Sequence, residues 1–262
     1  MDRTQTNQVL KRIAAGAFSI AAFILLWHFG TKGTDLGKLM PGPFQVIGHF
    51  FRSFVKKIGP ETVIGHVAWS LSRVLIAFSV ASVVGITLGL TMGWYRKVEA
   101  IFRPYFEMIR PIPPIAWIPM AIIWFGLGEM TVYFLIFLAA LSNVTMNAYA
   151  GAKAVDPTLV GAAKMLGAND RQIFLTIVLP SSVPYIFAGL QIALSSSWAT
   201  VVAAEMVRSS RGIGWVIISG MELNNMTQIL AGIIGIGLIG FLLAVLMRTI
   251  EARLISWKEG GQ

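Results

Sequence analysis

The chain has 262 residues, of which 56% are apolar and only 13% are charged, and its mean hydropathy is +0.72. A soluble domain needs a charged shell of roughly a quarter of its residues, and a disordered chain lacks this many apolar side chains, so the composition predicts an integral membrane protein. The absence of cysteine excludes disulfides and thiolate metal sites, and a net charge of +9 in a membrane protein is typical of basic cytoplasmic loops rather than nucleic-acid binding.

Several apolar segments are long enough to cross a bilayer, which takes about 20 mostly apolar residues. They are expected at about 13–30, 71–94, 101–125, 130–150, 181–207 and 227–247. The first follows two basic residues, but no small-residue cleavage site comes after it, so we interpret it as a retained helix rather than a signal peptide. Lys and Arg are more numerous in the connections that are cytoplasmic if the N-terminus is inside. The sequence therefore predicts an all-α integral membrane fold of about six transmembrane helices, N-in/C-in, in a single domain over 1–262.

The segment 31–70 mixes polar and apolar residues and is expected to form an external loop with an amphipathic helix. Its large apolar residues recur at helical spacing beside basic ones: Phe44, Ile47, Phe50, Phe51 and Phe54. Such a helix can lie on the membrane surface or pack against the transmembrane helices, and the sequence leaves both open.

Glycines and prolines shape the second and third predicted spans. Gly85, Gly89 and Gly93 recur every fourth residue, which predicts a face where two helix backbones approach closely. The third span cannot stay straight, since each proline removes a backbone donor and clashes one turn back. Non-helical backbone at membrane depth is tolerated only beside protein or a water-filled cavity, so we expect this span to bend next to a pathway. Its prolines are Pro104, Pro111, Pro113, Pro114 and Pro119.

Motifs of enzyme chemistry are missing from the sequence. The pattern G-x-G-x-x-G at 235–240 lies inside an apolar span with no preceding strand, which favours helix packing over dinucleotide binding, and no phosphate-binding loop is present. His28, His49 and His66 lack metal-ligand spacing, and each is expected at an interface or the surface. We therefore expect no catalytic residue, no metal site and no cofactor in this chain, which is not predicted to be an enzyme.

The segment 151–180 is comparatively polar and carries helix start and stop signals. Asp156 is a good N-cap and Pro157 suits the first helical position, while Gly167 suits the C-terminal end. A second capping signal follows, and Pro180 is expected to end that helix. Two short helices at roughly a right angle would then project between two spans. A rigid, capped projection is suited to transmit motion from a soluble partner.

This segment resembles the EAA loop of permease subunits from bacterial ATP-binding cassette (ABC) importers. The shared features are the small residues at 161–163, Gly167 and the ending Ile-x-Leu-Pro at 177–180, although Gly161 replaces the acidic first residue of the family pattern. Further stretches resemble permeases for taurine, alkanesulfonates, nitrate and bicarbonate, and the taurine type is most similar. They lie at 110–117, 123–129, 198–205 and 211–215.

The resemblance implies a type I ABC importer permease-like fold in the bacterial cytoplasmic (inner) membrane. It also implies a homodimer, two ATPase subunits that bind ATP and Mg, and an external substrate-binding protein. The expected function is ATP-driven import of a small anionic or zwitterionic solute. An ion-coupled secondary transporter is the alternative, for which Glu205 is the carboxylate nearest to the depth that proton coupling requires. The residues implied to dock on the ATPase subunits are Asp156, Pro157, Leu159, Gly161, Ala162, Ala163, Leu166, Gly167 and Arg171.

Hydroxyl, amide and aromatic side chains in the fourth and fifth spans are candidates for the translocation pathway. The hydroxyls could bind the oxygens of an anion or hydrogen-bond neighbouring helices, and both interpretations remain open. Glu205 is expected to pair with Arg208 one turn later, and Arg110 to reach the membrane interface. The pathway candidates are Arg110, Pro113, Pro114, Asn143, Asn147, Ser195, Ser197, Trp198, Thr200 and Glu205.

Overall fold

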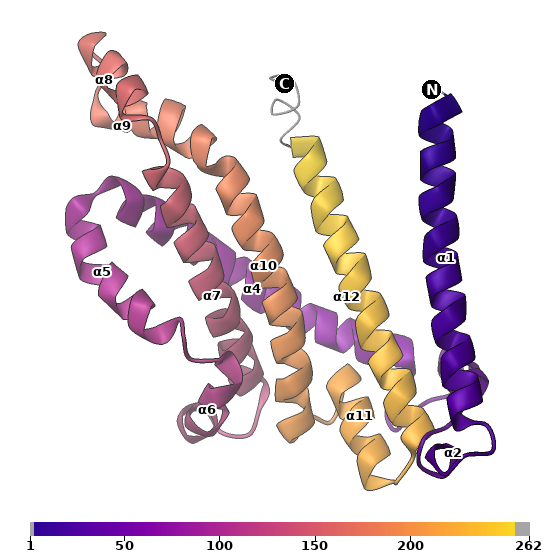
Figure 1. Ribbon diagram of the computed structural model, residues 1–262. Helices are drawn as coiled ribbons and strands as arrows, with labels where there is room; N and C mark the ends of the chain where they lie inside the picture. Colours follow the sequence, from indigo (N-terminus) through magenta and orange to yellow (C-terminus); the bar gives the residue numbers. More distant parts are fainter. Residues whose placement is uncertain (1–2, 255–262) are drawn as a thin grey trace. The chain divides into compact units, whose positions relative to one another are not determined.

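The computed structural model describes residues 3–254, which form helices and their connections with no β-strand in this range (Figure 1). The α-helices are α1 (Arg3–Thr31), α2 (Leu36–Leu39), α3 (Pro43–Arg52), α4 (Val63–Trp94), α5 (Arg96–Ile109), α6 (Ile118–Phe125), α7 (Glu129–Lys153), α8 (Pro157–Met165), α9 (Asp170–Ile173), α10 (Leu179–Arg208), α11 (Ile213–Glu222) and α12 (Met226–Leu254). A 3₁₀ turn, η1 (Pro114–Trp117), precedes α6, and a π-helical turn, η2 (Phe174–Val178), joins α9 to α10. The described residues form two compact units, one of residues 3–63 with Val216–Gly235 and the other of Ile64–Trp215 with residues 236–254.

The helices long and apolar enough to cross a membrane match the predicted spans. Within residues 3–254, five helices qualify alone: most of α1, α4, α7, the run from α9 through α10, and α12. A sixth span results if α5 and η1–α6, which meet at 90°, are counted as one broken span. The prediction of about six helices, with the third one bent, is confirmed. The helix α11 was not expected, and at 10 residues it is too short to cross a bilayer.

The first unit holds the amphipathic helix expected in the segment 31–70. One face of α3 is buried, because Val46 and Phe50 pack with Ala231 of α12 and beside Trp27 of α1. Phe44 and the other aromatic side chains on the opposite face are exposed. Of the two interpretations left open, the structure favours packing against neighbouring helices.

The second unit contains the close helix contact predicted from the glycines of α4. Gly85, Gly89 and Gly93 face α7, and a Cβ added at Gly89 would lie 2.7 Å from the Cβ of Ala148. A Cβ at Gly93 would overlap Ala152. These contacts confirm the predicted packing face, on which two backbones meet without side chains between them.

The predicted end of a helix at Pro180 is wrong. The chain stays helical from Asp170 to Arg208, and Pro180 lies in the first turn of α10, just after η2. A π turn changes the hydrogen-bond spacing, so the missing N–H and the ring of the proline are accommodated without a stop. The loop therefore contains one short separate helix, α8, instead of two.

Candidate functional site

The projecting helix α8 is capped at both ends as the sequence predicts. Asp156 Oδ1 accepts a hydrogen bond from the Thr158 N–H at 2.8 Å, and Pro157 occupies the first turn. At the other end Gly167 has a φ of +84°, which a glycine adopts without strain, and the Ala168 N–H donates to the Ala163 carbonyl at 3.0 Å. These bonds fix α8 as a rigid element between α7 and α9.

The apolar side chains of α8 are uncovered. Met165 is 85% exposed and Leu166 is 89% exposed, while Leu159 is 54% exposed. The other residues predicted to dock, Gly161, Ala162 and Arg171, are exposed as well, and Ala163 is half-buried. In Figure 1, α8 lies beyond the end of α7 and α10, at the end opposite to α6.

Removing the N-cap of α8 should loosen its first turn. In Asp156→Ala the Thr158 N–H loses its acceptor, so hydrogen–deuterium exchange of the amides at 158–160 should speed up, whereas Asp156→Asn keeps an acceptor oxygen and should change little. The same hydrogen bond lowers the pKa of Asp156 below its ordinary value, so the stabilisation is present above that ordinary value and is lost as pH falls through the lowered pKa. Equal exchange in the wild type and the alanine variant would contradict this role.

A first cavity, which we call the α7 cavity, lies between the bend after α5, α7 and α10. Its volume is about 260 Å³. The polar residues and the proline that line it are Arg110, Pro114, Ser142, Asn143, Ser196 and Thr200. It thus brings together four of the predicted pathway residues, from three elements that are separate in the sequence.

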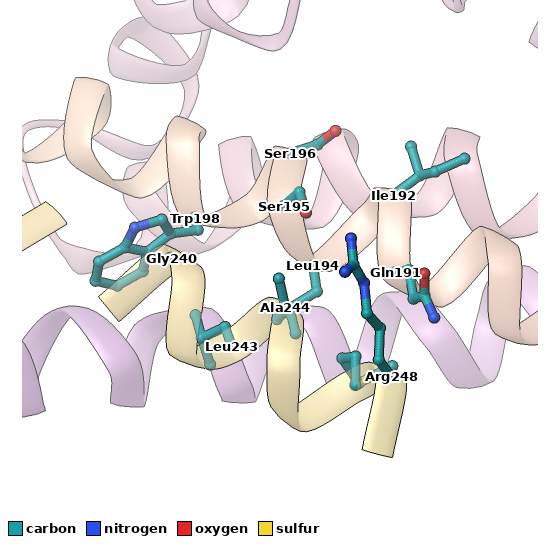
Figure 2. A pocket seen from close by; sticks show the side chains of 11 residues that line it. Gln191, Ile192, Leu194, Ser195, Ser196, Trp198, Gly240, Leu243, Ala244 and Arg248 are labelled. Carbon is teal, nitrogen blue, oxygen red and sulfur yellow. The ribbon is translucent and has the colours of Figure 1, made fainter. Parts of the chain in front are cut away.

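A second cavity, which we call the α12 cavity, lies between α10 and α12 and has a volume of about 510 Å³ (Figure 2). Ser195 and Trp198 line it from α10, and the Trp198 Nε1–H donates to the Ile236 carbonyl at 3.0 Å. Figure 2 shows Arg248 extending from α12 toward the serines of α10. The residues predicted for one pathway are therefore divided between two cavities, since Ser195 and Trp198 line the α12 cavity and Thr200 lines the α7 cavity. Ser196, which was not among the predicted pathway residues, lines both.

The remaining candidates line neither cavity. Pro113 is exposed in the bend, and Asn147 donates to the Asn143 carbonyl at 2.8 Å. Ser197 is fully buried, and its hydroxyl makes no hydrogen bond to a described residue. These positions contribute to the bend and to helix packing in the second unit.

Glu205 is bound differently from the prediction, which paired it with Arg208. Its carboxylate is fully buried and accepts from Arg73 Nη1 at 2.8 Å, Ser70 Oγ at 2.8 Å and the Gly214 N–H at 3.0 Å. The Arg208 side chain lies outside the described residues. The observed partner comes from α4, 132 positions earlier in the chain, because helix packing rather than sequence neighbourhood brings it there.

Arg73 connects this carboxylate to a second one. Its Nε and Nη2 bind both oxygens of Glu129 at 2.7 and 2.5 Å, and its Nη1 donates to the Arg211 carbonyl at 2.9 Å. Arg73 is 2% exposed, whereas the Glu129 side chain is 53% exposed. We refer to Ser70, Arg73, Glu129, Glu205 and the segment 211–214 as the charge cluster. It ties α4, the start of α7, the end of α10 and the start of α11 together.

His66 extends this region and corrects another prediction. It was expected at an interface or the surface, but it is fully buried, accepts from the Gly212 N–H at 3.1 Å and stacks on Trp215. Among the described residues, no group of His, Cys, Asp or Glu has the arrangement of a metal site. One signal for the cluster was available in the sequence: an arginine near the start of a predicted span needs a partner.

The apolar helices, the broken span beside the polar α7 cavity and the projecting capped helix are together typical of a multi-pass membrane transport protein. The model of the family described as "Binding-protein-dependent transport system inner membrane component" matches residues 62–256. The chain belongs to this family of ABC importer permeases, in the group of nitrate, sulfonate, taurine and bicarbonate permeases.

Individual relatives agree with this assignment. The chain is 38% identical to the taurine transport system permease protein TauC of Escherichia coli, over 88% of this chain and 84% of TauC. It is 31% identical to the nitrate import permease protein NrtB of Synechocystis, over 95% of this chain and 91% of NrtB. A chain of the MetNI methionine ABC transporter is 18% identical but has the same fold, with a TM-score of 0.60 over 72% of this chain and 94% of that chain. The predicted type I ABC importer permease fold is confirmed.

Proposed function

We propose that this chain is the permease subunit of an ATP-driven importer that moves a small anionic or zwitterionic solute into the cytoplasm. Taurine or an alkanesulfonate is the first choice of solute, and nitrate or bicarbonate the next. The identity to TauC over most of both chains supports this order. The working complex is a homodimer of this subunit with two ATPase subunits, which bind ATP and Mg, and an external substrate-binding protein, in the bacterial cytoplasmic membrane.

The observation that carries the ATP-driven mechanism is the uncovered apolar end of α8. On this proposal α8 faces the cytoplasm, and Met165 and Leu166 insert into an apolar groove of an ATPase subunit. ATP binding then closes the two ATPase subunits and carries α8 with them. Because α8 is capped and joins α7 to the α9–α10 run, its displacement moves these helices as rigid bodies. The helices then pack differently against one another, and a central cavity that was open to one side of the membrane opens to the other.

An ion-coupled secondary transporter is less well supported. Proton coupling needs a carboxylate deep in the membrane that can exchange its proton with water. Glu205 was the best candidate, but its carboxylate is fully buried and bound by Arg73, Ser70 and a backbone N–H. An ion-coupled transporter also has no use for an exposed docking helix.

The proposal is tested in proteoliposomes that contain the permease, its ATPase subunits and the substrate-binding protein. Uptake and ATP hydrolysis are measured with taurine, an alkanesulfonate, nitrate and bicarbonate in parallel. We expect one of these solutes to stimulate ATP hydrolysis and to be taken up only when ATP is present. Uptake that needs an ion gradient and proceeds without ATP would contradict the proposal.

Replacing Leu166 by Asp should uncouple ATP hydrolysis from uptake, since a charge cannot be buried in an apolar groove without a partner. We expect uptake to fall by about tenfold or more, while the permease still folds, because Leu166 is exposed in the free chain. Leu223→Asp is the matched control, since Leu223 is 73% exposed outside α8 and should tolerate the charge. Normal uptake by Leu166→Asp in an assembled complex would refute the docking role.

A further inference from the structure

The α7 cavity has the chemistry of an anion site. The cationic residue Arg110 lines it together with the hydroxyl-bearing residues Ser142, Ser196 and Thr200, which come from two helices. Among the described residues that line the cavity, none is acidic. A lining of one cation and several neutral donors favours a ligand that carries negative charge on oxygen atoms.

The hydrogen bonds around the cavity leave donors available. Asn143 Nδ2 donates to the Ala139 carbonyl at 2.9 Å and to Ser196 Oγ at 3.3 Å, so the Ser196 oxygen serves as an acceptor and its hydrogen remains for a ligand. The Ser142 hydroxyl oxygen is buried and makes no hydrogen bond to a described residue. A buried hydroxyl without a partner is costly, and a bound acceptor would satisfy it.

The bend in the broken span explains why Arg110 reaches this place. Arg110 follows α5 directly, and the chain turns by 90° before α6 continues. Three prolines at 111, 113 and 114 have no N–H to donate, so the arginine side chain is the strong donor that this connection offers the cavity.

We propose that the α7 cavity binds the oxyanion group of the transported solute, with Arg110 as the residue that selects for negative charge and Ser142 as a second donor. This inference rests on the proposed function. At about 260 Å³ the cavity is smaller than the roughly 300–1,000 Å³ of sites for drug-sized ligands, which suits a small solute. The guanidinium fork binds two oxygens of a sulfonate, nitrate or carbonate group at once.

The α12 cavity offers a matched control. It also contains an arginine and serines, but Gln191 in its wall is hydrogen-bonded to the carboxylate of Glu251, one turn after Arg248. An acidic side chain thus lies within one helical turn of Arg248 and beside this cavity, which makes the α12 cavity less suited to an anion. Arg248→Gln therefore removes the same positive charge from a comparable cavity. The proposal gives this cavity no role in solute binding.

The test compares variants of the reconstituted complex in the uptake of radiolabelled taurine. Arg110→Gln should lower uptake at limiting taurine by about 10- to 100-fold, Ser142→Ala by about three- to tenfold, and Arg248→Gln by less than about twofold. Arg110→Lys should recover part of the uptake, since it keeps the charge without the fork. Co-purification of the ATPase subunits with each variant shows that the complex is assembled, and Arg248→Gln should keep ATP hydrolysis without solute within about twofold of the wild type.

Uptake by Arg110→Gln within about twofold of the wild type, or an equal loss in Arg248→Gln, would overturn the site but not the proposed function. If the wild type takes up none of the four solutes with ATP, the proposed function fails. The site is then tested by equilibrium binding of radiolabelled taurine to the same complex. Binding that Arg110→Gln abolishes and Arg248→Gln retains supports the site, whereas no binding by the wild type, or equal binding by both variants, overturns it.

Discussion

Arg73→Met should lower the free energy of unfolding of the permease by about 3–5 kcal/mol, as expected when one partner of a buried ion pair is removed. The variant leaves the Glu205 carboxylate fully buried without its cation, and it releases Glu129 and the Arg211 carbonyl. The methionine fills much of the space of the arginine stem, so the loss reflects charge rather than a cavity. Unfolding in mixed micelles, followed by tryptophan fluorescence, measures the effect.

Glu129→Gln is the control within the same cluster. Its side chain is 53% exposed, so water replaces much of the lost interaction, and the expected cost is about 1 kcal/mol or less. A cost as large as that of Arg73→Met would mean that the stability of the cluster depends on the half-exposed pair rather than on the buried one. A negligible effect of Arg73→Met would contradict the structure of the cluster.

Gly89→Leu should force α4 and α7 apart. Even a Cβ at this position would overlap the Thr145 carbonyl and come within 2.7 Å of the Ala148 Cβ, and neither neighbour is the end of a flexible side chain. We expect a loss of at least about 3 kcal/mol in the free energy of unfolding, or failure to obtain folded permease, since overpacking of a close contact costs this much when the backbone must move.

Gly237→Leu is the matched control for this prediction. Gly237 lies within α12, and a Cβ there meets nothing within 4 Å. Because glycine weakens a helix by roughly 0.5–1 kcal/mol relative to alanine, this variant should be neutral or slightly more stable in micelles that hold the permease alone. If Gly89→Leu were as stable as Gly237→Leu, the helix contact described above would be wrong.

The features predictable from the sequence are those encoded within one or two helical turns. Long apolar runs predicted the spans, the prolines predicted the bend between α5 and α6, and Asp156 and Gly167 predicted the ends of α8. Each of these signals acts on the local backbone, so no knowledge of neighbouring helices is required. The four-residue glycine spacing in α4 also predicted a contact, although not that its partner is α7.

The features that were not predicted depend on which helices pack together and on which residues along their axes come into contact. The pair of Arg73 and Glu205 joins positions 132 apart, and only the packing of α4 beside α10 makes them neighbours, whereas Arg208 was chosen for its closeness in sequence. His66 likewise contacts residues far away in the sequence, since the Gly212 N–H donates to it and Trp215 of α11 stacks on it. The division of the pathway candidates between two cavities depends on the direction in which each polar side chain of α10 points. Helical periodicity shows which residues share a face, but it does not show which neighbouring helix that face contacts.

The π turn at Phe174–Val178 has a consequence for how this loop tolerates insertions and deletions. One residue corresponds to about 100° of rotation around a helix axis, since a turn takes 3.6 residues. Deleting a single residue from this turn would restore regular α-helical winding. It would also rotate α8, with the exposed Leu159 and Leu166, around the axis of α10. The direction in which α8 projects therefore depends on the number of residues between Asp170 and Pro180.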